Sequence, residues 1–349
     1  MADISIGVIG AGGMGTRHVL NLQHHVKGAR VVAIYDLDQA LARQVAAECG
    51  SAKVFQDPVQ LIQDAGVDAV VIASPDPTHA AFVHACLRHH KPVLCEKPLA
   101  TTADEAQEII EAEQAQGRRL IAVGFMRRFD PQHVAVRQVV VAGEIGRPIL
   151  FKGVHRNPMI PPHLPGEVVV ANSAIHDIDS TRWLLGQEIT EVYVRGVRTH
   201  MSFSDETRDM LLLQMVLNGE CLATVEVSVA IEYGYEVSAE IVGERGTALT
   251  AQPGLALVRS RGAQFVAVSK DHLARFQEAY MPELTEWVHS VQTGQAFTGA
   301  TAWDGYMSLV VSDACIQSLH SGTPVPVSTP AKPGLYQERE LLSSTPGSS

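Results

Sequence analysis

The chain has 349 residues, of which 46% are hydrophobic and 19% are charged, as in an ordinary globular protein long enough for two domains. Asp and Glu (38) outnumber Lys and Arg (27), which disfavours nucleic acids and anionic membranes as partners. No apolar stretch approaches the roughly 20 residues that span a bilayer, and the N-terminal segment has no signal-peptide pattern. The five cysteines are scattered and show no metal-site spacing, so we expect reduced thiols, a cytoplasmic location and no metal.

Up to Val123, short apolar runs alternate with amphipathic stretches. The apolar runs are Ile4–Ile9, Val31–Tyr35, Ala69–Ile72, Val93–Cys95 and Leu120–Val123, and the expected helices include Leu41–Cys49, Ala80–Arg88 and Ala103–Gln116. Continuous apolar runs suit strands that are covered on both faces, and their alternation with helices indicates parallel βαβ units. The pattern predicts an α/β domain with a doubly wound parallel sheet over residues 1–123.

After Val123 the pattern changes to consecutive strands. We expect a helix at Pro131–Ala142, a strand at Ile149–Val154, a Pro-rich loop at Asn157–Gly166 and a helix from about Ser173 to Leu185. The next strand-like runs are Val192–Val197, Met210–Leu217, Ala223–Ile231, Tyr235–Val242, Thr247–Thr250 and Leu255–Val258, followed by helices at Phe276–Thr293 and Ala302–Leu319. Strands without intervening helices predict an α+β domain, residues 124–337, with a large, mostly antiparallel open sheet. The polar, Ser-rich residues 338–349 are expected to be a disordered tail.

The first chemical motif is a glycine-rich turn, Gly10-Ala-Gly12-Gly13-Met14-Gly15, between the first strand and a helix. In such a turn Gly10 permits the tight bend, Gly12 lets the backbone approach a pyrophosphate, and Gly15 allows close helix–strand packing. The helix N-terminus then offers free N–H groups to the phosphates. The motif predicts a dinucleotide site, and a plain glycine-rich turn without a ligand is the alternative.

Asp36 ends the second strand at the position where dinucleotide sites place an acid. A carboxylate there accepts hydrogen bonds from the adenosine ribose hydroxyls and repels a 2′-phosphate, and no Arg follows immediately. NAD is therefore favoured over NADP. The alternative is that Asp36 or Asp38 only caps the next helix, and Asp38 suits that role better.

Lys97 follows a predicted parallel strand in the segment Cys95-Glu-Lys-Pro-Leu99. Ligands of open α/β sheets bind at the carboxyl ends of the strands, so this lysine could hold a substrate hydroxyl and stabilise a developing alkoxide. A solvated surface lysine is the alternative.

A predicted helix carries Asn172, His176, Asp179 and Trp183 at i, i+4, i+7 and i+11, so these residues share one helical face. A histidine near its ordinary pKa of about 6.5 can accept a hydroxyl proton as a general base. The alternative is a core or capping histidine packed beside a tryptophan.

Together these segments resemble the glucose–fructose oxidoreductase/inositol dehydrogenase family, and especially its inositol 2-dehydrogenases. The residues that carry the resemblance run from Gly10 to about residue 245: Gly10–Gly15, Ala73-Ser74-Pro75 with His79, Glu96-Lys97-Pro98, Gly124-Phe-Met-Arg127-Arg128-Phe-Asp130, His155-Arg-Asn157-Pro158, His176 with Asp179, Arg182–Gly186, and Tyr233-Gly-Tyr235. The resemblance implies a Rossmann domain, a second α/β domain whose open sheet supports dimers and tetramers, and NAD-dependent oxidation of a secondary hydroxyl of a cyclitol or sugar.

The resemblance also implies roles for individual residues. Lys97 would orient the reacting hydroxyl and His176 would remove its proton, with residue 172 beside them. The implied cofactor residues are Gly10, Gly12, Gly13, Met14, Gly15, Asp36, Ser74, Pro75, His79, Glu96 and Lys97, and the implied substrate residues are Lys97, Arg127, His155, Asn157, Asn172, His176 and Tyr235.

One position departs from the family pattern, because the aspartate expected four residues before the histidine is Asn172 here. An amide can bond a hydroxyl but cannot stabilise an imidazolium by charge, which puts turnover and substrate identity in doubt. A pyranose dehydrogenase, a glycosidase that uses NAD in a redox-neutral cycle, and a weakly active NAD- and sugar-binding protein therefore remain alternatives to a cyclitol dehydrogenase.

Overall fold

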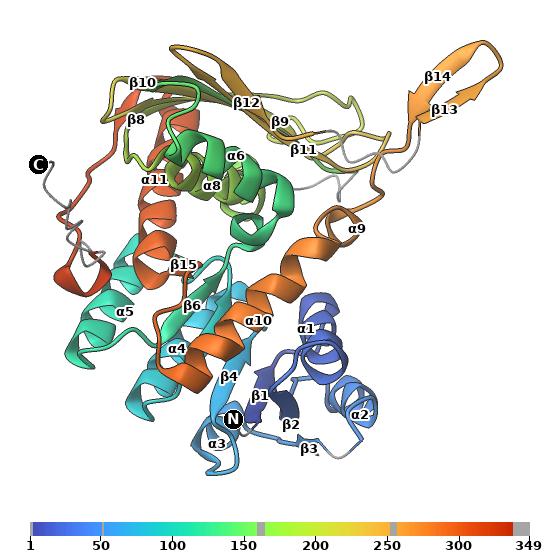
Figure 1. Cartoon of the computed structure of the whole chain (residues 1–349), viewed down its shortest axis with the longest axis vertical. Coiled ribbons are helices and arrows are strands. Elements are labelled where there is room, and N and C mark those ends of the chain that lie inside the picture. The colour runs from blue at the N-terminus through green and yellow to red at the C-terminus, as the bar shows by residue number, and fades with distance from the viewer. Residues whose placement is uncertain (1–2, 51, 159–164, 252–256, 338–349) are drawn as a thin grey trace, which may run out of the picture.

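Two seven-stranded sheets form the two halves of the chain, as the computed structural model shows (Figure 1). The structure describes residues 3–50, 52–158, 165–251 and 257–337. The expected tail at 338–349, most of the Pro-rich loop and the start of the expected strand at Leu255 lie outside these ranges.

The first sheet has the order β15-β6-β5-β4-β1-β2-β3. Its parallel strands are β1 (Ile4–Ile9), β2 (Ala29–Tyr35), β3 (Lys53–Val54), β4 (Ala69–Ile72), β5 (Val93–Glu96) and β6 (Ile121–Gly124). The helices between them are α1 (Gly13–His24), α2 (Gln39–Ala47), α3 (Pro58–Gln63), α4 (His79–Arg88) and α5 (Ala103–Ala115). The doubly wound parallel sheet is confirmed. Asp38 caps α2 by accepting N–H bonds from Ala40 (2.9 Å) and Leu41 (3.2 Å), which confirms the predicted cap. Asp36 is therefore not needed as the cap of this helix.

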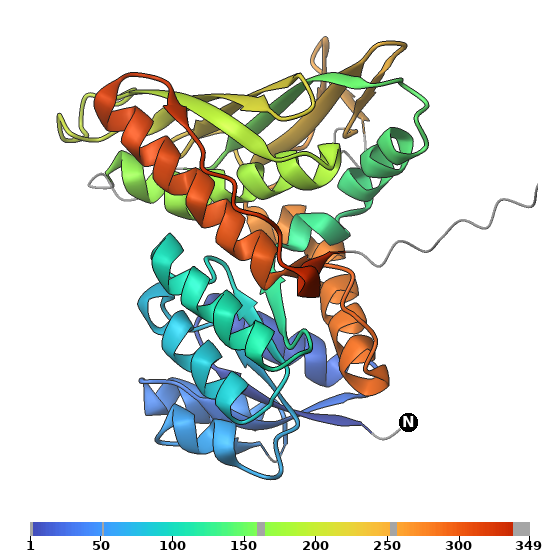
Figure 2. The ribbon, with the colours of Figure 1, turned by 90° about the vertical axis from the view of Figure 1, so that its left-hand side faces the viewer.

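The second sheet has the order β12-β11-β7-β10-β9-β8-β16. Its strands are β7 (Pro148–Arg156), β8 (Ile189–Val197), β9 (Met210–Leu217), β10 (Cys221–Ser228), β11 (Glu236–Gly243), β12 (Thr247–Leu249) and β16 (Val325–Pro326). Only β7 and β10 pair in parallel, so the mostly antiparallel sheet is confirmed. The helices α6 (Pro131–Val141), α8 (Ile175–Leu185) and α11 (Ala302–Ser321) lie on the face toward the first half (Figure 2).

The other face of the second sheet is open. Several large apolar side chains are exposed on this face, including Leu212, Val216, Leu222 and Leu249. Residues Val216 and Leu222 are direct partners across β9 and β10, so their side chains form one continuous apolar surface.

The chain returns to the first half after the second sheet. A hairpin, β13 (Leu257–Ser260) and β14 (Ala263–Val266), and the short α9 (His272–Arg275) lead into α10 (Gln277–Thr293). Leu284, Trp287 and Val288 of α10 are buried in the core beneath the first sheet. Strand β15 (Ala300–Thr301) then pairs antiparallel with β6. Residues 277–301 thus contribute to the first half, and the division at residue 123 into separate domains stays a prediction.

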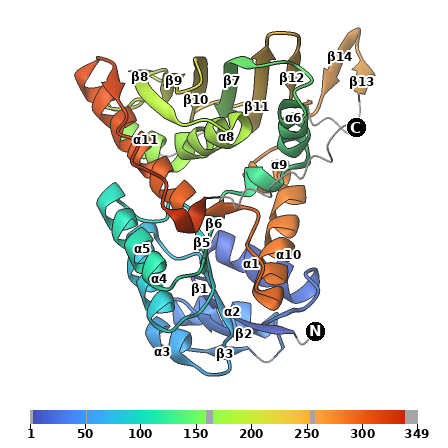
Figure 3. The ribbon, with the colours of Figure 1, turned by 60° about the vertical axis from the view of Figure 1, so that its left-hand side comes forward.

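Helix α11 connects the two cores. Met307 and Leu309, near its start, are buried with the first-half core, whereas Val311 and Cys315 are buried with the core of the second half. Figure 3 shows this helix running from the second sheet to the edge of the first. Across the described ranges, no helix is both long and apolar enough to cross a membrane.

The helix expected from about Ser173 begins earlier and is irregular. It starts with α7 (Gly166–Val169), passes through a π-helical turn at Val170–Ala174 and continues as α8. A π turn is a common feature of functional sites, and local sequence patterns do not signal it. Asn172 lies within this turn.

Candidate active site

The glycine turn after β1 has the close contacts that require glycine. Gly10 has a φ of +97°, and an added Cβ would lie 2.4 Å from the Ala73 carbonyl oxygen. A Cβ on Gly15 would lie 1.9 Å from the carbonyl oxygen of Gly10. Added Cβ atoms on Gly12 and Gly13, by contrast, meet no atom within 4 Å. The turn is therefore tightly packed against the protein on one side and open on the other, where a dinucleotide would approach.

The start of α1 is suited to phosphate. Its N-cap, Gly12, makes no side-chain cap bond, and its first turn has no acidic residue. The N–H groups and the positive end of the helix dipole are thus available to a pyrophosphate.

Asp36 lies beside this turn at the end of β2. Its Oδ2 accepts a hydrogen bond from Ala11 N (2.6 Å), and its Oδ1 accepts one from Asp38 N (2.8 Å). Each carboxylate oxygen retains a lone pair for a ribose hydroxyl. The glycine turn, the open helix start and this fixed carboxylate fit NAD.

The loop after β4 lies against Gly10, so Ser74 and Pro75 stay candidates for cofactor contact. His79 was predicted to join them, but its ring is buried and both ring nitrogens are occupied. Nδ1 lies 2.6 Å from the Pro98 carbonyl oxygen, and Nε2 lies 2.8 Å from the Ser74 carbonyl oxygen. His79 therefore joins two loops at the sheet edge, and its contact with a cofactor stays a prediction.

A cavity of about 220 Å³ brings most of the predicted residues together. Its walls include the predicted residues Met14, Glu96, Lys97, Asn157, Asn172, His176 and Tyr235, and also Met126, His272 and Tyr280, which sequence reasoning missed. Met126 lies in a segment that the family resemblance had marked. His272 and Tyr280 come from α9 and α10, whose return to the first half has no local signal in the sequence.

Lys97 joins the two halves at this cavity. It follows β5, and its Nζ donates a hydrogen bond of 3.2 Å to the main-chain carbonyl of Asn172 in the π turn. Burial lowers the pKa of Lys97, while the carboxylates of Glu96 and Asp76 oppose that shift. The charged ammonium is thus retained by neighbouring acids at a position where it can donate to a substrate oxygen.

His176 is buried at the start of α8, and its ring meets Phe125 edge-on with centroids 5.9 Å apart. Its Nδ1 has no hydrogen-bond partner within the described ranges. Burial places the pKa of His176 well below its usual range, and the positive charges of Lys97 and Arg127 act in the same direction. The ring is therefore neutral near pH 7, as a general base must be.

Arg127 and His155 were predicted to bond substrate hydroxyls, but the structure places them behind the cavity wall. Asp177 accepts a 2.6 Å bond from Arg127 Nη1, and its other oxygen lies 2.7 Å from His155 Nδ1. The same Nδ1 lies 3.0 Å from Arg127 Nη2, and Nε2 lies 3.2 Å from the Tyr235 hydroxyl. Asp177, which sequence reasoning missed, holds both side chains beside Tyr235, and their contact with substrate hydroxyls stays a prediction.

Asp179 and Trp183 do not reach the cavity either. Asp179 accepts two bonds from Arg128, at 2.6 and 3.1 Å, and the Trp183 ring packs against the guanidinium groups of Arg128 and Arg137. Of the four residues predicted on one helical face, only Asn172 and His176 line the cavity.

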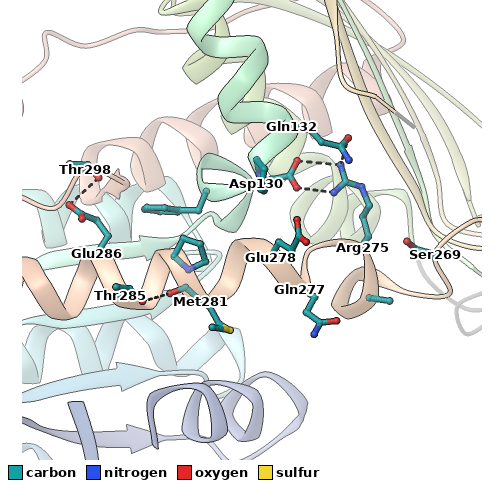
Figure 4. Close-up of a pocket in the computed structure, with 14 residues that line it drawn as sticks. Asp130, Gln132, Ser269, Arg275, Gln277, Glu278, Met281, Thr285, Glu286 and Thr298 are labelled. Atoms are coloured by element: carbon teal, nitrogen blue, oxygen red, sulfur yellow. Dashed lines mark hydrogen bonds and ion pairs between the residues drawn. The ribbon is translucent and has the colours of Figure 1, made fainter. Parts of the chain in front are cut away.

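A larger hollow of about 1090 Å³ lies along α10 and the segment before α6 (Figure 4). Its walls carry Glu278, Glu286 and the buried ion pair of Asp130 with Arg275, whose Nη1 lies 2.9 Å from the carboxylate. None of its wall residues comes from the glycine turn, β5 or α8. The smaller cavity is therefore the candidate active site.

Both halves of the chain match models of known protein families. Residues 4–125 match the oxidoreductase-family model for an NAD-binding Rossmann fold, and residues 137–327 match the model for its C-terminal α/β domain. An inositol 2-dehydrogenase from Rubrobacter xylanophilus is 51% identical over 96% of each chain. A second relative, inositol 2-dehydrogenase 1 from Saccharopolyspora erythraea, is 46% identical over 95% of this chain and 99% of its own.

One similar solved structure is that of myo-inositol dehydrogenase from Lactobacillus casei in complex with NAD(H) and myo-inositol. The TM-score is 0.92 and the sequence identity is 32%, and the match covers 96% of this chain and 100% of that chain. The family matches cover both halves of the chain, and Lys97 and His176 line a cavity together with Met14 of the glycine turn. The chain belongs to the glucose–fructose oxidoreductase/inositol dehydrogenase family of NAD-binding oxidoreductases.

Proposed function

We propose that this protein oxidises a secondary hydroxyl of a cyclitol with NAD, with myo-inositol or a stereoisomer as the leading substrate. The observation that carries the proposal is that Lys97 and His176 share one cavity wall with Met14 of the glycine turn. The cofactor site and the polar cavity are therefore continuous. The inositol dehydrogenases among the similar proteins support the choice of substrate class.

In the proposed reaction Lys97 and His176 have separate roles. When bound, NAD supplies the hydride acceptor. The Lys97 ammonium donates a hydrogen bond to the reacting oxygen and stabilises the negative charge that develops there. The neutral His176 ring takes the hydroxyl proton as the carbon loses hydride.

Asn157, Tyr235 and His272 are the candidate partners for the remaining hydroxyls. Asn157 is oriented by donating to Ser173 Oγ at 3.1 Å, and burial raises the pKa of Tyr235 to about 12, so its hydroxyl keeps its proton. Hydroxyl groups are costly to bury unpaired, so such partners select a polyol over an apolar alcohol.

The reaction is tested by following NADH at 340 nm with inositol isomers and aldopyranoses, each with NAD and NADP. We expect net NADH production from an inositol. Turnover with a pyranose alone would favour the pyranose dehydrogenase, aglycone release without net NADH would favour the glycosidase, and neither signal would indicate a binding protein.

Replacing Lys97 by Ala should lower kcat by about 10²-fold or more while NAD still binds, because the oxygen loses its charged donor. The measurement pairs steady-state kinetics with an NAD titration by fluorescence. Unchanged kcat in this variant would show that Lys97 does not contact the reacting oxygen.

Asp36 should set the cofactor preference. NAD should be favoured over NADP by at least about tenfold in kcat/KM, which corresponds to about 1.4 kcal/mol. Asp36→Ser should narrow this ratio, since the repulsion of a 2′-phosphate is removed. Equal use of both cofactors by the unaltered protein would contradict the assignment.

Asn172→Asp should change the acidic side of the pH profile. Oxidation needs neutral His176, so kcat/KM falls as the pH drops through the pKa of His176, which lies well below its usual range. A carboxylate at 172 would favour the imidazolium and raise that pKa, and the acidic limb should move to higher pH. At pH 8 the more basic ring should raise kcat on an inositol.

The pH profiles of both forms, measured on the best polyol, decide this point. Lower activity of the Asp form at every pH would mean that Asn172 binds a substrate group specific to this protein. An unchanged profile and rate would mean that residue 172 does not act on His176.

We also propose a cytoplasmic homo-oligomer, a dimer or tetramer, built on the open face of the second sheet. Exposed apolar patches of this kind are typical of interfaces, and all five cysteines are unpaired and buried. Leu222→Lys should lower the mass measured by light scattering, whereas Leu37→Lys, at an exposed position outside that sheet, should not. A monomer in the unaltered protein would contradict the proposal.

A further inference from the structure

His18 connects the cofactor-binding helix to the base of the active-site cavity. It lies in α1, is fully buried, and places its Nε2 2.7 Å from Oε1 of Glu96. Glu96 is the last residue of β5 and lines the cavity beside Lys97. One histidine thus joins the helix that begins at the glycine turn to the residue next to the catalytic lysine.

The Glu96 carboxylate is held from more than one side. Its Oε2 accepts a 3.3 Å bond from Lys97 N, and it packs so closely on Gly124 that a Cβ there would lie 3.0 Å from Oε2. Two donors and a neighbouring glycine therefore fix one orientation of this side chain.

The Glu96 bond is the polar contact that anchors the His18 ring. Its Nδ1 is buried and finds no partner in the described part of the chain. Burying an imidazole is costly unless it is hydrogen-bonded, and an apolar side chain would pack at this place without that cost. A role for the Nε2 bond would account for a histidine at this buried position.

We propose that His18 is a positioning residue for the dehydrogenase reaction, which holds the Glu96 carboxylate beside Lys97 so that the lysine remains the ammonium donor to the reacting oxygen. The proposal rests on the function proposed above for Lys97.

Electrostatics at the cavity agree with this geometry. Burial lowers the pKa of Lys97, and the charge of Arg127 lowers it further. The carboxylates of Glu96 and Asp76 raise the same pKa. His176 and His272 also face this ammonium. Burial alone would raise the pKa of Glu96, but the bond from His18 and the charges of His18, Lys97 and His79 keep it below its usual range.

Two groups on α10 also face Glu96. The pKa values of Tyr280 and Glu283 are both raised, first by burial and further by the Glu96 charge, so both stay protonated and leave that charge unneutralised. Glu96 is therefore an anion at a fixed position beside Lys97, where its charge favours the protonated lysine.

The test is the basic limb of the kcat/KM profile, where activity falls as Lys97 loses its proton. In His18→Leu the Glu96 carboxylate loses the shorter of its two hydrogen bonds and can turn from Lys97, which disfavours the ammonium, so this limb should move down by about one pH unit. In His18→Gln the limb should lie at the same pH as in the unaltered protein, because the amide N–H of the glutamine can donate to Glu96. His24→Leu, at an exposed position of the same helix, should leave the profile unchanged.

Each variant is also checked for thermal stability and for NAD affinity by fluorescence titration. A folded, NAD-binding His18→Leu protein with the unaltered profile would overturn the proposal. If His18→Leu does not fold, Glu96→Gln is measured in its place. Its basic limb must show the same downward shift, and an unmoved limb in this variant would also overturn the proposal. Absence of a Lys97-dependent limb in the unaltered protein, with Lys97→Ala still active, would instead contradict the proposed function itself.

Discussion

The contact between Lys97 and the main-chain carbonyl of Asn172 is the interaction on which the active site depends. Lys97 belongs to the first half and Asn172 to the second, so this bond sets how β5 and the π turn face each other. Because the acceptor is a backbone atom, the bond is available whatever side chain occupies position 172. The exchange of the family aspartate for asparagine therefore alters the charge near His176 without removing the anchor of the lysine.

The doubly wound sheet was predictable because each strand carries its own signal. Strand β4 is fully buried along its length and consists only of Ala, Val and Ile. A short run of this kind is typical of a strand that is covered on both faces. The glycine turn likewise carries its own signal within one βα unit. The antiparallel sheet was predicted from consecutive strands without intervening helices. The alternation of buried and exposed residues that β9 shows in the structure is not visible in its sequence, which is apolar at every position but one.

The parts that sequence reasoning missed depend on contacts between distant segments. Nothing local marks Asp177 as the acid that holds Arg127 and His155, since its partners lie 50 and 22 residues away. His272 and Tyr280 reach the cavity only because α10 leaves the second half. The low pKa of His176 likewise arises from burial and from charges on other elements, so its spacing in the helix could suggest a base but not its acidity.

Helix α11 has a mechanical consequence for the cavity. The chain crosses between the halves after β6, before α10 and along α11, and the last crossing is one continuous helix of 20 residues anchored in both cores. A hinge at a single linker would have to bend this helix or pull apart one of its two buried ends. The helix therefore braces the two halves against each other and opposes a hinge motion that would widen the cavity. With the halves braced in this way, discrimination among ring-shaped polyols falls to the side chains on the cavity wall.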